Sequence, residues 1–84
     1  MHYVYVLQSN KDRNLYVGCT SNLQKRVAMH NSGKVSSTHL RSPFRVIFYE
    51  AFVNSHDAFE QEQWLKTGWG RNRLRIMLRN TLKI

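Results

Sequence analysis

Hydrophobic and polar positions divide the chain into six short elements. Two segments rich in β-branched and aromatic residues, 2–7 and 15–19, flank a polar run and predict a hairpin. Apolar residues then recur at helical spacing over about 21–31, 56–66 and 71–82, and a third strand-like segment covers 45–53. This order predicts a single α+β domain over residues 1–84, with a small three-stranded, mainly antiparallel sheet flanked by helices.

Polar residues and glycines set the expected helix ends. Ser21 or Thr20 is expected to cap the first helix, and Ser55 the second. Gly68 and Gly70 are expected to end the second helix before the last one begins. The serine-rich residues 34–41 are expected to form a loop.

The charge of the chain indicates an anionic partner. Thirteen Lys and Arg face five Asp and Glu, which gives a net charge of +8 on 84 residues. Small basic domains most often bind nucleic acid, and less often an anionic membrane. The alternative is that the charge serves solubility alone.

A single cysteine limits the chemistry and suggests a compartment. Cys19 forms no intrachain disulfide and no cysteine-rich zinc site, so an intracellular, reducing, cytoplasmic setting is expected. No stretch approaches the roughly 20 apolar residues of a membrane span, and no signal peptide is visible.

The first predicted helix carries two polar residues on an otherwise apolar face. Leu23, Arg26, Val27 and His30 share that face by their spacing. One interpretation places Arg26 at the rim of the core with its charge in water. The other is a half-buried basic pair directed at an anion.

The second predicted helix places an acid within an apolar stripe. Glu62 shares a face with Ala58, Phe59 and Leu65, whereas Glu60 points away. Carboxylates are seldom buried unless they are paired or bind metal. The alternatives are therefore an ion pair with one of the arginines, or a ligand for Mg²⁺ or Mn²⁺.

The last predicted helix combines a core stripe with a basic ridge. The expected core positions are Leu74, Met77, Leu78, Thr81 and Leu82. Like charges at helical spacing repel one another. Contact with a phosphate backbone therefore explains the basic residues of this helix at least as well as simple exposure to solvent does. The predicted phosphate contacts of the whole chain are Lys25, Lys34, Arg41, Arg71, Arg75 and Arg79.

Other polar residues suggest no further chemistry. His2, His39 and His56 lack partners at metal-ligand spacing, so no zinc role is assigned. Ser36 and Ser37 have no histidine and acid at the spacing of a serine hydrolase.

Two strand motifs resemble those of the GIY-YIG nuclease superfamily. The first is Tyr3-Val4-Tyr5, with Tyr3 in place of the family's glycine, and the second is Tyr16-Val17-Gly18. The family's arginine, histidine and glutamate match Arg26, His30 and Glu62, the residues that helical spacing also identifies as unusual. Residues 30–34 and 65–71 resemble small standalone bacterial members, which are similar to the N-terminal nuclease module of an excision-repair protein.

The resemblance implies a metal-dependent endonuclease that hydrolyses phosphodiester bonds in DNA. Glu62 would hold one Mg²⁺ or Mn²⁺ ion, Arg26 would bind phosphoryl oxygens, and Tyr16 would take a proton from the attacking water. Tyr5 would position the water or the phosphate, and His30 would relay the proton or contact phosphate. The family's later asparagine has two candidates, Asn72 and Asn80; both lie off the apolar stripe, so neither is assigned a role.

Two alternatives belong to other functional classes. A non-catalytic DNA- or RNA-binding module would need the arginines but not an inward carboxylate. A protein-interaction domain would use exposed Trp64 or Trp69, although a tryptophan between glycines is as often a cap on a small core. Branched nucleic acid is a further candidate substrate, and a homodimer or a partner protein would supply targeting.

Overall fold

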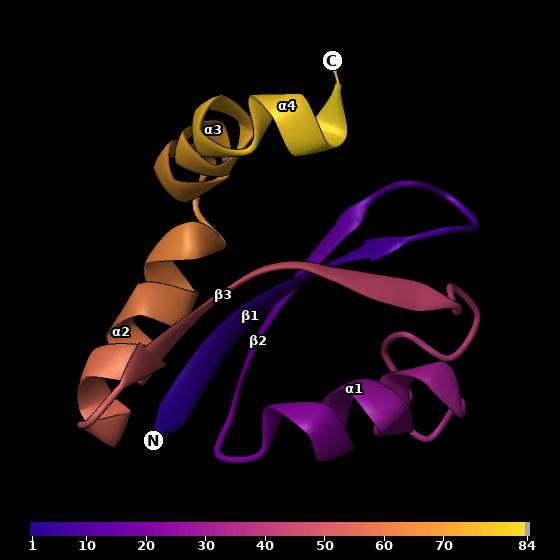
Figure 1. Cartoon of the computed structure of the whole chain (residues 1–84), viewed down its shortest axis with the longest axis horizontal. Coiled ribbons are helices and arrows are strands. Elements are labelled where there is room, and N and C mark those ends of the chain that lie inside the picture. Colours follow the sequence, from indigo (N-terminus) through magenta and orange to yellow (C-terminus); the bar gives the residue numbers. More distant parts are fainter. Residues whose placement is uncertain (84) are drawn as a thin grey trace.

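A three-stranded antiparallel sheet forms the centre of the protein, which a computed structural model describes for residues 1–83 (Figure 1). The middle strand, β1, lies between β2 and β3 and pairs antiparallel with both. The predicted α+β class and antiparallel sheet are confirmed. The elements are β1 (His2–Ser9), β2 (Leu15–Thr20), α1 (Leu23–Asn31), β3 (Phe44–Phe52), α2 (Ser55–Leu65), α3 (Gly68–Met77) and α4 (Arg79–Leu82).

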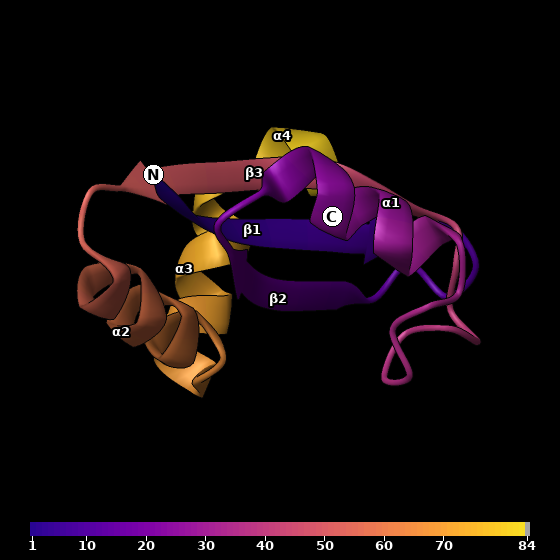
Figure 2. The ribbon, with the colours of Figure 1, turned by 90° about the horizontal axis from the view of Figure 1, so that it is seen from below.

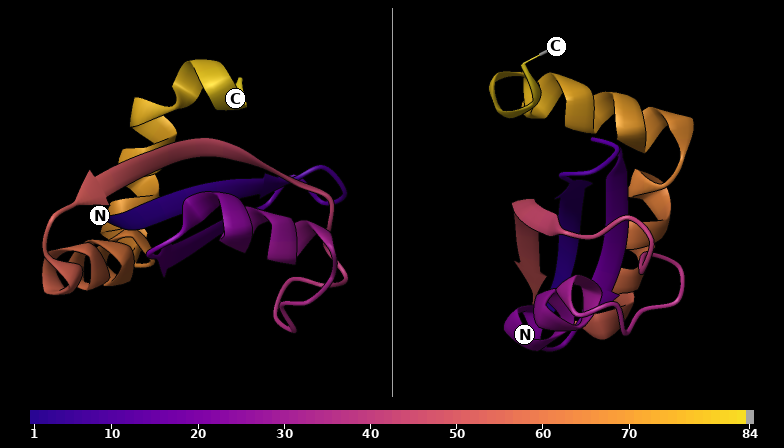
Figure 3. Two further views of the ribbon diagram at one scale, coloured as in Figure 1. Left: turned by 60° about the horizontal axis from the view of Figure 1, so that its bottom comes forward. Right: turned by 90° about the vertical axis from the view of Figure 1, so that its right-hand side faces the viewer.

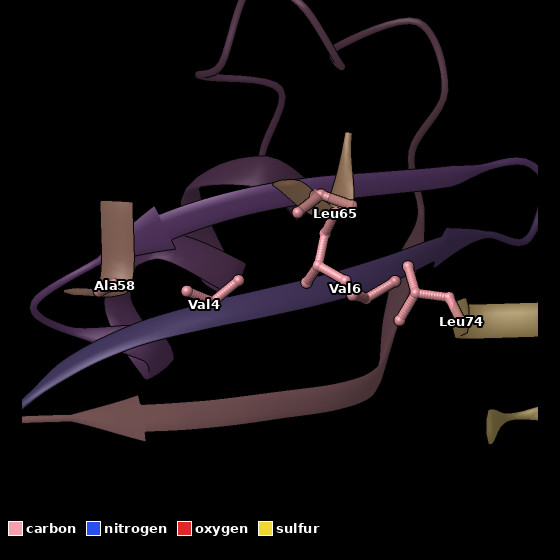
Figure 4. Close-up of a cluster of buried hydrophobic side chains, with 6 residues drawn as sticks. Val4, Val6, Ala58, Leu65 and Leu74 are labelled. Atoms are coloured by element: carbon pink, nitrogen blue, oxygen red, sulfur yellow. The ribbon is translucent and has the colours of Figure 1, made fainter. Parts of the chain in front are cut away.

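One face of the sheet packs against the C-terminal helices. Val4 and Val6 of β1 contact Ala58 and Leu65 of α2 and Leu74 of α3, and all five side chains are buried (Figure 4). Burying an aliphatic side chain of this size contributes roughly 1.5–3 kcal/mol, so this small cluster is a main source of stability.

The other face of the sheet packs against α1. Side chains alternate along a strand, so Tyr5 and Leu7 point away from the valines and join Phe44, with Leu23 and Val27 packed beside them. Figure 2 and Figure 3 show α1 on one side of the sheet and α3 with α4 on the other. The domain therefore has two thin apolar layers.

The helix caps differ from those predicted. Asn22 and Asn54 cap α1 and α2, each accepting backbone hydrogen bonds through its side chain. Thr67 caps α3 by accepting from the Gly70 amide at 3.2 Å. Gly68 therefore begins the next helix, where the sequence predicts a break, because a side-chain acceptor at residue 67 satisfies the first turn.

The predicted helix over 71–82 is wrong in its continuity and in part of its core stripe. It starts earlier and is interrupted at Leu78, which packs against the valine cluster. Met77 is 39 % exposed and Thr81 is also exposed. Apolar spacing continues across the interruption, so the pattern alone does not reveal it.

Two aromatic side chains of the C-terminal half are exposed. Phe59, which the sequence assigns to the apolar stripe, is 55 % exposed, so that assignment is wrong. Trp69 is 81 % exposed, which agrees with the exposed alternative for this tryptophan and not with a cap on the core. In this thin fold no other described element covers them.

Among residues 1–83, no helix has the length and apolar character needed to cross a bilayer.

Candidate active site

The centre of the site is a tyrosine of β1 that lies across a glycine of β2. Tyr5 is 1 % exposed and is paired with Gly18 in the sheet register. A Cβ at residue 18 would overlap the Tyr5 ring and its hydroxyl. Gly18 therefore provides the space in which this ring lies over the neighbouring strand.

Three side chains form a hydrogen-bonded chain from Tyr5 into the protein. The Tyr5 hydroxyl lies 2.9 Å from His30 Nε2, and His30 Nδ1 lies 2.8 Å from Thr38 Oγ1. Thr38 donates its single hydroxyl proton to the Val35 carbonyl at 3.4 Å. Thr38 Oγ1 therefore accepts from Nδ1–H, and Nε2 is left to accept the Tyr5 proton.

Burial keeps both ends of the Tyr5–His30 pair neutral. Burial lowers the pKa of His30, and the charge of Arg26 lowers it further. Burial also raises the pKa of Tyr5, against an opposing hydrogen-bond contribution from Arg26. The expected basic pair on α1 is thus one cation beside a neutral histidine with no exposed surface.

The lowered pKa of His30 predicts that stability falls on mild acidification. The unfolded chain, with a histidine pKa near ~6.5, takes up this proton before the folded chain does. The stability that results from the lowered pKa of His30 is fully present above pH ~6.5 and is lost as the pH falls toward the pKa of His30 in the folded protein. The free energy of unfolding then changes by at most about 1.4 kcal/mol per pH unit. Urea unfolding between pH 7.5 and pH 5 should show this slope in the wild type. His30→Gln should flatten it, and an equal slope in both proteins would contradict the prediction.

Glu62 is a buried carboxylate with two protein partners. It is 9 % exposed, and its oxygens meet Lys66 Nζ at 2.7 Å and the Gln63 amide at 3.1 Å. The ion pair that the sequence allows is therefore present, with a lysine in place of an arginine. Burial raises the pKa of Cys19 on β2, and the Glu62 charge raises it further, which places this carboxylate beside the β2 edge.

A metal at this position would depend on Glu62 and on non-protein ligands. Among residues 1–83, no three His, Cys, Asp or Glu side chains converge on one point. Mg²⁺ commonly binds through one or two carboxylates plus water and substrate phosphate, so the residues present fit that mode. Lys66 is 42 % exposed at its side chain and has room to release the carboxylate.

The remaining predicted site residues lie around this centre. The Tyr16 ring is 5.0 Å from the His30 ring and 6.4 Å from the Tyr5 ring, between ring centroids. Arg26 is half-buried on α1 and influences the pKa of both Tyr5 and His30. Glu62 is the smallest of the influences acting on Tyr5. The structure thus brings five predicted residues to one region at the β2 edge of the sheet.

Comparison with known proteins shows the family of this chain. A family model described as the GIY-YIG catalytic domain matches residues 1–74. The chain belongs to the GIY-YIG family. This superfamily consists of nucleases, so the GIY-YIG assignment implies a nucleic-acid substrate.

Small bacterial GIY-YIG relatives match most of the chain. It is 41 % identical over 66 residues to UPF0213 protein OB0043 of Oceanobacillus iheyensis, covering 77 % of this chain and 76 % of that protein. It is 34 % identical to UPF0213 protein CPE1444 of Clostridium perfringens, covering 99 % and 89 %. The solution NMR structure of UPF0213 protein BH0048 from Bacillus halodurans has a TM-score of 0.57 at 32 % identity, covering 90 % of this chain and 83 % of that one.

Five of the six predicted phosphate contacts of this GIY-YIG domain fall into two regions. Lys25 lies on α1, and Lys34 lies in the loop that follows it. Arg41, Arg71 and Arg75 line one cleft on the α3 side. The guanidinium of the remaining contact, Arg79, bonds to the Ile76 carbonyl at 3.1 Å. Asn72 and Asn80 are both exposed and have no assigned role.

Thr38 is the site residue that sequence reasoning misses. It is fully buried and fixes the orientation of His30, yet it lies in the polar stretch expected to be a loop. Residues in loops have no periodic spacing that would reveal burial. Only the run of small hydroxyl residues at 36–38 marks the position.

Proposed function

We propose that this GIY-YIG domain is a metal-dependent endonuclease that hydrolyses phosphodiester bonds in DNA. The observation that carries the proposal is the meeting of Arg26, the buried carboxylate of Glu62 and the neutral Tyr5–His30 pair at one edge of the sheet. A cation, an acid and proton-transfer groups in one place are the parts that phosphodiester hydrolysis requires.

Arg26 would bind the scissile phosphate. A guanidinium presents several N–H donors in a plane and matches two phosphoryl oxygens at once. Its half-buried position strengthens that interaction, because fewer water molecules compete for the phosphate. It would therefore stabilise the additional negative charge of the transition state.

Tyr16 would accept the proton of the attacking water. Its ring is only half-buried, and among residues 1–83 its hydroxyl has no protein hydrogen-bond partner. Tyr5 donates its own proton to His30, so its oxygen lone pairs would orient the water. Because His30 is fully buried, it would act through Tyr5 and not by touching phosphate.

Glu62 would hold one Mg²⁺ or Mn²⁺ ion together with water and phosphate oxygens. When bound, this ion supplies Lewis-acid polarisation of the phosphate and stabilises the leaving oxygen. Lys66, released from the carboxylate, would remain nearby as a counter-charge for the substrate.

The test is nicking of supercoiled plasmid by the purified full chain. Nicked circles should appear with Mg²⁺ or Mn²⁺ and be absent in EDTA. Binding of the same plasmid, measured in EDTA by gel shift, controls for folding and for contact with DNA. Cutting that persists in EDTA would refute the metal requirement.

A non-catalytic DNA- or RNA-binding module is the second candidate. The Glu62–Lys66 ion pair favours it, because this pair gives the buried acid a counter-ion without any metal. This candidate predicts nucleic-acid binding but no nicking with either metal. The plasmid assay and its binding control therefore separate the two functions.

A further inference from the structure

A basic cleft lies between the last two helices and the β1–β2 hairpin. It encloses about 750 Å³. Figure 1 shows α3 and α4 on the side of the sheet away from α1. Residues of both helices line the cleft. Five of its lining residues are cationic: Arg13, Arg41, Arg71, Arg75 and Lys83.

The cleft is on the face of the sheet opposite to Tyr5 and α1. Gln8 of β1 lines it and shares a strand face with Val4 and Val6, which pack against the C-terminal helices. Tyr5 and Leu7 face α1. Arg45 donates to the Gln8 side-chain oxygen at 2.9 Å and adds a further cation beside the cleft.

The cations of the cleft have little negative charge near them. Within residues 1–83, none of the lining residues is acidic. The neighbouring acid is Asp12, which binds Arg41 Nε at 2.9 Å and is held ionised, its pKa lowered by the Asn14 amide and by Arg41. One carboxylate against five cations leaves a strongly positive cleft, which favours anions.

Two of the basic residues have an unfavourable backbone conformation. Arg13 has φ 66° and Lys83 has φ 51°. Among residues 1–83 these are the only non-glycine residues with positive φ, and both line the cleft. Local structure accounts for both, because Arg13 is in the turn between β1 and β2 and Lys83 is the left-handed C-cap of α4.

We propose that this cleft binds a single strand of nucleic acid through its backbone phosphates. The inference rests on the proposed function for its nucleic-acid partner, but it concerns a separate surface. A volume of about 750 Å³ is that of an ordinary ligand cleft, and it does not hold a duplex, whose major groove alone is ~12 Å wide. A flexible strand enters such a cleft, and its phosphates meet cations from both walls.

The test is binding of a short fluorescein-labelled oligo(dT) in EDTA, followed by anisotropy. We expect Arg75→Gln to weaken binding about fivefold and to reduce the log–log salt slope by about 0.7, the value for one phosphate contact on a single strand. Arg13→Asn should act likewise, and asparagine tolerates the left-handed backbone at this position. Arg73→Gln is the matched control, since it removes the same charge from α3 outside the cleft.

The outcomes separate the cleft from the catalytic proposal. An equal effect of Arg73→Gln would mean diffuse attraction and would overturn the inference. So would tighter binding of a blunt duplex than of oligo(dT), or displacement of oligo(dT) by micromolar AMP, which would indicate a small-nucleotide site. Loss of oligo(dT) binding in the cleft variants, with no plasmid nicking by the wild type, would support the cleft while the endonuclease proposal fails. NMR amide shifts at Gln8, Arg13 and Leu82 should map the bound strand.

Discussion

Replacing Glu62 with glutamine is expected to reduce Mg²⁺-dependent plasmid nicking at least about 100-fold. A bound metal contributes several kcal/mol of transition-state stabilisation, and about 1.4 kcal/mol changes a rate tenfold. Glutamine keeps the shape of the side chain but loses the charge that a divalent ion requires. The fold should persist, because the partner left behind, Lys66, is half-exposed and regains water.

Glu60→Gln is the matched control for this variant. It removes the same charge from the same helix at an exposed position and should leave nicking unchanged. A second readout is independent of activity: Mn²⁺ should broaden the NMR signals around Glu62 in the wild type and not in Glu62→Gln. If Glu62→Gln cuts as fast as the wild type, the carboxylate has no metal role.

Replacing Gly70 with alanine is expected to destabilise the fold by about 2 kcal/mol or more. A Cβ at residue 70 would overlap the Trp64 carbonyl and the Leu65 Cα. These are backbone atoms at the end of α2, so relief requires α3 to move and to draw Leu74 out of the core. Thermal unfolding should show a fall in Tm of about 8–16 °C for a domain of this size.

Gly68→Ala provides the comparison within the same helix turn. A Cβ there meets nothing within 4 Å, and alanine is the better helix former. Its Tm should therefore equal or slightly exceed that of the wild type. Equal destabilisation by both variants would mean that glycine flexibility, and not the close contact at residue 70, is what matters.

The sequence predicts those parts of the site that depend on local periodicity. Helical spacing places Arg26 and His30 together, and it places Glu62 inward because Ala58 and Leu65 flank it on the same face. Each of these interpretations depends only on residues within one or two turns of the same helix. The burial of His30 and Glu62 in the structure agrees with the inward positions that the spacing predicts.

Features that depend on tertiary contacts could not be predicted in the same way. Thr38 is buried because its loop folds back onto His30, which no spacing within 34–41 indicates. Phe59 has the spacing of a core residue, but no element within residues 1–83 covers it. The Glu62–Lys66 ion pair is different, because it is local and can be read from the sequence. A glutamate four residues before a lysine on the same helix is a favourable arrangement for an ion pair.

The close contact at Gly70 has a mechanical consequence for substrate binding. It fixes the angle between α2, which carries Glu62, and α3, which carries Arg71 and Arg75. If this angle were variable, the two helices would lose conformational freedom each time a substrate contacted both, and the affinity for the substrate would fall. Here that freedom is already lost on folding, so the spacing between acid and cations is preorganised before any strand arrives.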